Sequence, residues 1–236
     1  MYNEFIVGGN FMLTQEDITS IKKSFPFYSK LSSKDSELFL SNVVKKNYKK
    51  GENIYNGATQ CLGLLKVLKG DLRTYILSEQ GKEVTLYRLF PGDFCILTAS
   101  CILHNITFDV YVDAEEDTTV FLIPAKIYAI LNKNVYVENF TYKTTIDHFS
   151  DVMWTMEQIL FMSFDQRLAI FLLDEYNQKK TLFIPLTHST VATYMGSARE
   201  VVSRMLKYFE NEGIVKLSRG GIEILDLEAL KSFAHN

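Results

Sequence analysis

The stretch LTHSTVATYMGSAREVVSRMLKYFENEGIV, residues 186–215, decides the fold of the C-terminal part of the chain. Thr187 has the side chain of a helix N-cap and precedes a short helical pattern. Gly196 follows that pattern where the chain must turn sharply, so we expect a positive φ there. Ser197 and Glu200, three positions apart, have the spacing of a capping box that starts a second helix. The stretch therefore predicts a helix-turn-helix.

The second predicted helix has an apolar side and a polar side. The apolar side, which we expect in the core, consists of Val202, Met205, Leu206 and Phe209. The polar side consists of Arg199, Glu200, Ser203, Arg204 and Lys207. A helix that reads the major groove needs planar donors for guanine, here the two arginines, and an acceptor for the cytosine amino group, here the glutamate. A solvated helix surface gives the same charge pattern, so the spacing alone leaves both interpretations open.

A β-hairpin is predicted directly after this helix. The segment GIVKLSRGGIEIL, residues 213–225, contains two short strand patterns, with Gly220-Gly221 as the turn. Arg219 at the tip would contact phosphate, as the wing of a winged helix does. Asp226 is predicted to cap a last short helix.

Short β runs separated by glycines dominate residues 43–123. The runs are LGLLKVL, LRTYIL, EVTLYRLF, FDVYVDA and TTVFLIP. In LRTYIL and EVTLYRL, apolar and polar residues largely alternate, as in strands with one side in solvent. Many short antiparallel strands with tight glycine turns predict a β-barrel or jelly roll.

Helical patterns flank this β region on both sides. Two short helices are predicted within residues 11–42, the first starting after Thr14. A longer helical pattern covers residues 125–163 and contains an apolar stripe with alternating spacings of three and four, extended backwards by Tyr142. The stripe consists of Ile146, Phe149, Met153, Met156 and Leu160. Such a narrow stripe favours pairing of the helix with its copy across a dimer axis, and packing within its own domain is the alternative.

The composition excludes several classes of protein. The 236 residues are 47% hydrophobic and 22% charged, which is typical of a globular chain rather than a disordered one. The formal net charge of −3 excludes a globally basic surface for nucleic acid but leaves room for a local basic face. Three cysteines do not make a disulfide framework. No signal peptide or membrane span is predicted, so we expect a cytoplasmic protein without a membrane partner.

Two blocks of the sequence carry a resemblance to the Crp/Fnr family of transcription regulators. The first block, residues 49–94, resembles the cyclic-nucleotide-binding β-roll in its glycine spacing and its terminal Pro-Gly-Asp-Phe. The second block, Gly-Ser-Ala-Arg-Glu-Val-Val-Ser-Arg at residues 196–204, is similar to the family's recognition helix. With the connecting helix, the resemblance covers the chain from about residue 20 onward.

The resemblance implies an α+β fold in three parts. Residues 1–132 are predicted to form a double-stranded β-helix, or jelly-roll, sensor domain with N-terminal helices. Residues 133–163 would form a dimerisation helix, and residues 164–236 a winged helix-turn-helix DNA-binding domain. The implied function is an effector-responsive regulator that binds a pseudo-palindromic DNA site as a homodimer and has RNA polymerase as a partner. Thr187, Ser197 and Arg219 then join the polar side of the second helix as DNA-binding residues.

The sequence departs from the family pattern for cyclic AMP. Family members that bind cyclic AMP have a Gly-Glu pair after the Pro-Gly-Asp-Phe turn and an Arg-Ser pair a few residues later. This chain has Cys95-Ile96-Leu97 where the glutamate is expected and Phe108-Asp109 where the arginine is expected. A cyclic phosphate needs a cationic or N–H-rich partner, so we predict that cyclic AMP does not bind. An iron–sulfur cluster is also disfavoured, because residues 1–60 contain no cysteine.

The effector is therefore left open. The candidate pocket consists of Cys95, Leu97, Cys101, Phe108, Val152 and Met153. The two cysteines of this pocket are interpreted first as small buried hydrophobes. A redox pair, ligation of haem or a metal with His104, and an apolar small molecule beside unreactive cysteines are the alternatives. The effector is thus an unidentified small molecule or a redox signal.

Two other functions compete with a regulator. The first is a ligand-binding β-roll protein with a degenerate DNA-binding domain, and the arginine-bearing polar face argues against it. The second is an enzyme, but no nucleophile–base–acid set, metal-ligand spacing or phosphate loop is visible. The four histidines are scattered and make no metal pair: His104, His148, His188 and His235.

Overall fold

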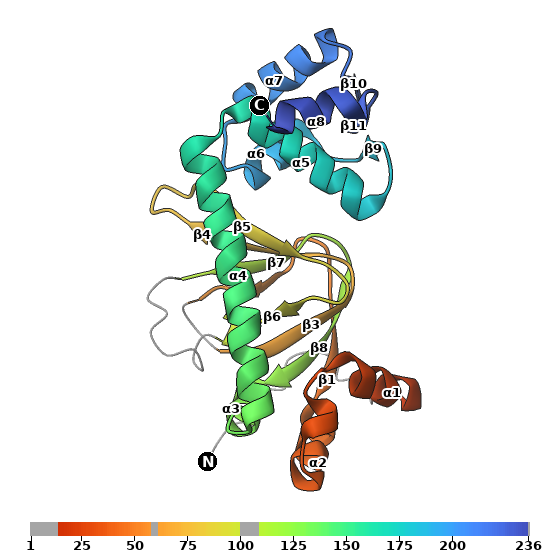
Figure 1. Cartoon of the computed structure of the whole chain (residues 1–236), viewed down its shortest axis with the longest axis vertical. Coiled ribbons are helices and arrows are strands. Elements are labelled where there is room, and N and C mark those ends of the chain that lie inside the picture. The colour runs from red at the N-terminus through yellow and green to blue at the C-terminus, as the bar shows by residue number, and fades with distance from the viewer. Residues whose placement is uncertain (1–13, 58–60, 100–108, 236) are drawn as a thin grey trace. The chain divides into compact units, whose positions relative to one another are not determined.

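The computed structural model describes residues 14–57, 61–99 and 109–235 (Figure 1). Its contacts divide the chain into two compact units. The first unit comprises residues 1–76 and 86–150, and the second comprises residues 77–85 and 151–236. Among the described helices, none combines the length and the apolar character that crossing a lipid bilayer requires.

Two four-stranded sheets form the centre of the first unit. The first sheet has the order β1 (Val44–Tyr48), β8 (Thr118–Pro124), β3 (Gly63–Lys69) and β6 (Phe94–Cys95). The second sheet has the order β2 (Asn53–Tyr55), β7 (Tyr111–Ala114), β4 (Leu72–Leu77) and β5 (Glu83–Leu89). The described strand pairings are antiparallel, which confirms the predicted antiparallel β fold.

The N-terminal helices complete the core of this unit. Helix α1 (Gln15–Ser24) begins with a capping box between Thr14 and Asp17, as the sequence predicts for its start. The short 3-10 helix η1 (Tyr28–Lys30) and α2 (Ser33–Asn42) follow. Phe25 and Phe39 are fully buried and meet edge to face, with their ring centroids 5.1 Å apart. These helices therefore cover apolar side chains of the β-roll with an aromatic layer.

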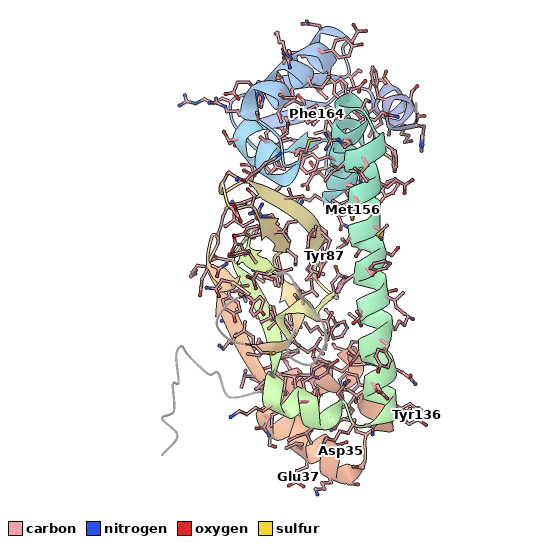
Figure 2. All side chains as sticks on the ribbon, turned by 90° about the vertical axis from the view of Figure 1, so that its left-hand side faces the viewer. Asp35, Glu37, Tyr87, Tyr136, Met156 and Phe164 are labelled. Carbon is pink, nitrogen blue, oxygen red and sulfur yellow. The ribbon has the colours of Figure 1, made fainter. Side chains whose placement is uncertain are left out.

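The predicted helical stretch after the β region divides into two helices, α3 (Ala125–Leu131) and the 27-residue α4 (Val135–Phe161). One side of α4 is buried in the first unit. On that side, the His148 ring stacks on Tyr87 at 4.5 Å between ring centroids, and its Nε2 lies 2.8 Å from the carbonyl oxygen of Phe94. The members of the predicted apolar stripe are exposed. One of them, Met156, is labelled in Figure 2.

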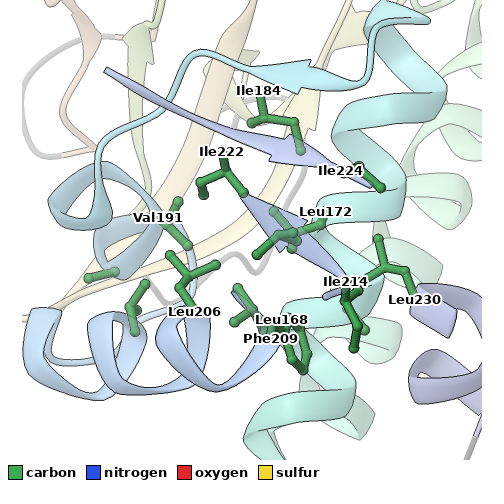
Figure 3. Packing of buried hydrophobic residues seen from close by; sticks show 14 residues of the cluster. Leu168, Leu172, Ile184, Val191, Leu206, Phe209, Ile214, Ile222, Ile224 and Leu230 are labelled. Carbon is green, nitrogen blue, oxygen red and sulfur yellow. The ribbon is translucent and has the colours of Figure 1, made fainter. Parts of the chain in front are cut away.

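The second unit contains helices α5 to α8 and a small three-stranded sheet. Its helices are α5 (Phe164–Lys179), α6 (His188–Tyr194), α7 (Arg199–Asn211) and α8 (Leu227–His235). The sheet has the order β10 (Val215–Ser218), β11 (Gly221–Ile224) and β9 (Phe183–Ile184). Apolar side chains from these elements converge in one core, among them Leu172, Leu206 and Ile222 (Figure 3). Burial of this kind is the main force that holds the helices in place.

Candidate nucleic-acid interface

The turn between α6 and α7 has the geometry that the sequence predicts. Thr187 caps α6, because its hydroxyl accepts a hydrogen bond from the backbone N–H of Thr190 at 3.1 Å. Gly196 has φ +58°, a conformation that side chains other than glycine rarely adopt. The N–H of Ser197 then bonds back to the carbonyl oxygen of Ala192 at 2.9 Å. The tight turn thus fixes where α7 begins.

The predicted capping box at the start of α7 is wrong. The N-cap is Ala198, and it makes no side-chain capping bond. The N–H of Ser197 is held in the preceding turn, and the N–H groups of Val201 and Val202 both donate to the carbonyl oxygen of Ala198. The helix therefore starts one residue later than the sequence suggests. A capping role does not account for Glu200, whose side chain is exposed in the first turn.

Helix α7 separates an apolar and a polar side. Val202, Leu206 and Phe209 are fully buried, and Met205 packs against the same core. The predicted reading residues lie on the remaining surface: Arg199, Glu200, Arg204 and Lys207 are exposed, and Ser203 is half-buried. The structure thus brings these residues together on one helix. Guanidinium and carboxylate groups on one exposed helix can pair with guanine and with the cytosine amino group.

Lys207 and Glu210 connect α7 to the wing. The Lys207 Nζ lies 2.6 Å from Glu210 Oε2, and Glu210 Oε1 accepts a hydrogen bond from the Leu217 N–H of β10 at 3.0 Å. The hydrogen bond from Lys207, followed by that from Leu217, lowers the pKa of Glu210. Glu210 thus aligns the wing with the helix, a role that spacing alone did not predict.

The wing differs in its turn from the prediction. Ser218 pairs with Gly221, so the turn residues are Arg219 and Gly220, whose φ is +99°. Gly221 belongs to β11, and a Cβ atom there would lie 2.4 Å from the Phe183 ring of β9. The close approach of β9 therefore requires glycine at 221. The tip residue Arg219 is exposed, as predicted.

A hydrogen bond joins α6 to the polar side of α7. The His188 Nδ1 lies 2.9 Å from the Ser203 Oγ. Burial lowers the pKa of His188, and the nearby charge of Arg199 lowers it further. The sequence pattern predicted Ser203 on the polar side of the second helix. It missed this contact because the partners are 15 positions apart and only the helix-turn-helix brings them together.

The candidate effector pocket is described only in part. Cys95 is fully buried and free, and burial raises the pKa of its thiol to about 11. Its role as a small buried hydrophobe therefore fits, whereas a disulfide with Cys101 does not. Leu97 is also buried. On α4, Val152 is half-buried and Met153 is exposed.

Two predicted pocket residues, Cys101 and Phe108, lie outside the described residues together with His104. Of the two cysteines that the structure describes, Cys61 is the one in a disulfide, which the sequence did not predict. The sequence does not single out Cys61, because it is far along the chain from Cys95 and Cys101, the two cysteines whose spacing suggested a redox pair.

Two arginines of the β-roll are already paired with carboxylates. Arg88 Nη2 lies 2.7 Å from Asp71 Oδ2, and both side chains are largely buried. Arg73 Nε lies 3.0 Å from Glu115 Oε1 and is buried as well. Charges buried in this way need their partners. Neither arginine is therefore available to hold a phosphate without losing its carboxylate.

Two models of known protein families match this chain, one in the β-roll region and one in the helix-turn-helix region. The family model for the cyclic nucleotide-binding domain matches residues 45–134, and the one for the Crp-like helix-turn-helix domain matches residues 166–233. A solved structure from Eubacterium rectale, described as a transcriptional regulator of the Crp/Fnr family, is 46% identical. The match covers 91% of this chain and 100% of that chain, with a TM-score of 0.87.

Curated relatives are more distant. The cyclic AMP receptor protein of Thermus thermophilus is 24% identical, over 90% of this chain and 98% of its own length. The electron transport regulator A of Shewanella oneidensis is 25% identical, over 81% of this chain and 79% of its own length. The β-roll, the long helix and the helix-turn-helix, together with these matches, define a DNA-binding transcription regulator. The chain belongs to the Crp/Fnr family.

Proposed function

We propose that the chain acts as a homodimer that binds a pseudo-palindromic DNA site in response to a signal other than cyclic AMP. The observation that carries the proposal is the polar side of α7, where Arg199, Glu200 and Arg204 are exposed on a helix whose other side is fully packed. The two guanidinium groups can donate to guanine and the carboxylate can accept from the cytosine amino group. A gel shift on palindromic duplexes, with a scrambled duplex as control, tests this proposal.

The apolar stripe of α4 supports the homodimer. Ile146, Phe149 and Leu160 are 65%, 64% and 65% exposed, and Met153 and Met156 lie between them. A contiguous apolar surface of this kind marks an interaction site. Its spacing of three and four residues fits a parallel pair of helices, in which the same stripe from a second copy covers it.

The dimer determines the form of the DNA site. Two identical recognition helices related by a two-fold axis require half-sites about one turn, roughly 10 bp, apart. Each half should contain G·C pairs, since arginine favours guanine and glutamate accepts from cytosine. From the family resemblance, a TGTGA-like half-site is the first candidate and a TTGA-like half-site is the second. RNA polymerase is the proposed protein partner of the bound dimer.

The effector proposal rests on the β-roll. The position expected for the ribose-binding glutamate is Leu97, which is buried, and its neighbour Cys95 is a buried protonated thiol. The two buried arginines are paired with Asp71 and Glu115. These groups offer a cyclic phosphate no unpaired cation, so the signal we propose is an apolar small molecule or a redox change.

One observation favours the redox signal. Cys61 is in a disulfide, and disulfides in cytosolic proteins are most often catalytic or redox-sensing. A thiol–disulfide change at Cys61 would then alter the β-roll next to β3. DNA affinity measured with and without a reductant, for the wild type and for Cys61→Ser, tests this signal: only the wild type should respond.

A further inference from the structure

Ser203 and His188 form a hydrogen bond whose direction depends on where the histidine ring carries its protons. A serine hydroxyl has one O–H donor and two acceptor lone pairs. Ser203 lies among the exposed reading residues of α7, and its Oγ is 2.9 Å from the His188 Nδ1. If the hydroxyl donates in this bond, only its lone pairs are left for the groove; if it accepts, its O–H and one lone pair are left.

The protonation state of His188 sets the direction of this bond. A neutral imidazole with its proton on Nε2 has a bare Nδ1, so the Ser203 hydroxyl donates to it and only lone pairs face outward. A protonated imidazole donates from both nitrogens, so the Ser203 oxygen accepts and its own O–H is released. The first state suits the amino groups of adenine and cytosine, and the second suits the acceptors of guanine and thymine.

We propose that His188 is a positioning residue that makes Ser203 an acceptor at neutral pH and a donor at acidic pH, so that base preference opposite Ser203 depends on pH. This inference rests on the proposed function, because it needs α7 in the major groove. A residue with a fixed charge would not give two states of this kind, whereas histidine changes its charge in this pH range.

The surroundings of His188 favour the neutral state in the free protein. Helix α6 has the sequence HSTVATY, so it contributes no aspartate, glutamate, lysine or arginine. From α7, the charge of Arg199 acts on the ring, and it has the same sign as the protonated histidine. Phosphates of a bound duplex act in the opposite direction, so binding brings protonation of His188 closer to neutral pH.

The test compares duplexes that differ only in the base pair opposite Ser203. That base pair is found first, as the position whose preference is lost in a selection with Ser203→Ala. At pH 7.5 the wild type should prefer adenine or cytosine there, and at pH 5.5 the preference should move toward guanine or thymine. The change in relative affinity should be roughly 3- to 10-fold, as expected for one hydrogen bond.

Two variants separate His188 from other titrating groups. His188→Ala should show a weaker preference at this base pair and the same preference at both pH values. The control is His235→Ala, an exposed histidine at the end of α8, which should keep the wild-type pH dependence. A His188→Ala variant that keeps both the preference and its pH dependence would overturn the inference.

A measurement on the free protein distinguishes failure of the inference from failure of the proposed function. If no duplex is selected under any condition, the proposed function is wrong. Nitrogen NMR of the His188 ring does not depend on DNA: at pH 7.5 its Nδ1 should resonate as an unprotonated nitrogen. A neutral ring with the proton on Nδ1 would contradict the inference even if DNA binding is sequence-specific.

Discussion

At the scale of single residues, the contacts that a basic side chain of α7 or of the wing makes in the free protein affect what it contributes to DNA binding. Arg219 is exposed at the tip of the wing, whereas Lys207 forms an ion pair with Glu210 in the free protein. A cation that is already paired gains less from a phosphate than an exposed one, because the earlier contact must be replaced. The two basic residues are therefore not equivalent, although both belong to the predicted DNA-binding surface, Lys207 on α7 and Arg219 at the tip of the wing.

This difference predicts unequal salt effects. Arg219→Ala should weaken binding to all duplexes about equally and lower the slope of log affinity against log salt by about 1. Lys207→Ala should change that slope less, because the charge of Lys207 is already balanced by Glu210 and neutralises less phosphate charge. Fluorescence anisotropy titrations over a series of salt concentrations measure both slopes, with Arg219→Lys as a matched control that keeps the charge. An equal change of slope for both alanine variants would contradict this account.

The buried thiol of Cys95 gives a prediction for chemical reactivity. Its pKa is raised to about 11 by burial, so near pH 8 its thiolate fraction is about 100-fold lower than that of a free cysteine. Native protein treated with iodoacetamide should therefore leave the Cys95 peptide unmodified by mass spectrometry, whereas unfolded protein should be labelled there. The alkylation rate is low because the thiolate, and not the protonated thiol, is the nucleophile. Labelling of native Cys95 at the rate of the unfolded chain would show that it is a reactive sensor thiol.

At the scale of elements, α4 has two sides with different roles. Val137, Thr141 and His148 are buried in the first unit, whereas the apolar stripe is exposed. In a dimer, a charge on the stripe would be desolvated and would face its own copy. Met153→Glu should therefore destabilise the dimer by several kcal/mol, and analytical ultracentrifugation at micromolar concentration should show monomers.

The matched control is Lys143→Glu, because Lys143 is exposed on α4 but is not a member of the stripe. This variant adds a carboxylate to the same helix and should sediment like the wild type. If Met153→Glu also remains a dimer, the stripe is not the main interface between two copies.

The sequence predicted the elements with strong periodic patterns and missed those without them. Both N-terminal helices, the long helix and the three helices before the wing are confirmed. Strands β1, β2, β6 and β9 were missed. The β1 segment, VKKNY, is largely polar, and β6 and β9 have two residues each. Pairing with a neighbouring strand, as between β1 and β8, makes such segments strands, and that pairing is not visible in local pattern.

The candidate site shows the same limit. The residues of α7 were predicted because one helix carries them all, and their spacing gives the exposed side directly. The contacts of Glu210 with Leu217 and of His188 with Ser203 were not predicted, because each joins two elements. The capping box was wrong because the turn after Gly196 uses the Ser197 N–H, so that the helix begins at Arg199.

At the scale of the whole molecule, membership of the family does not determine the signal. The chain matches the cyclic nucleotide-binding domain, yet Leu97 replaces the expected glutamate and the buried arginines are paired. Calorimetry with cyclic AMP and with cyclic GMP should therefore show no binding below millimolar concentration. A micromolar dissociation constant for either nucleotide would contradict the effector proposal without affecting the assignment of the reading residues.

The central claim is that α7 reads a palindromic site through its exposed arginines, and a binding-site selection on random duplexes tests it most directly. The selection is performed with the wild type and with Arg199→Ala, at low salt and both with and without a reductant, so that a missing signal does not hide binding. We expect the wild type to enrich a palindrome with half-sites roughly 10 bp apart. Arg199→Ala should lose the preference at one base pair of each half-site, at a cost of about 1–3 kcal/mol. An Arg199→Ala selection that yields the same preferences as the wild type at every position would contradict the claim.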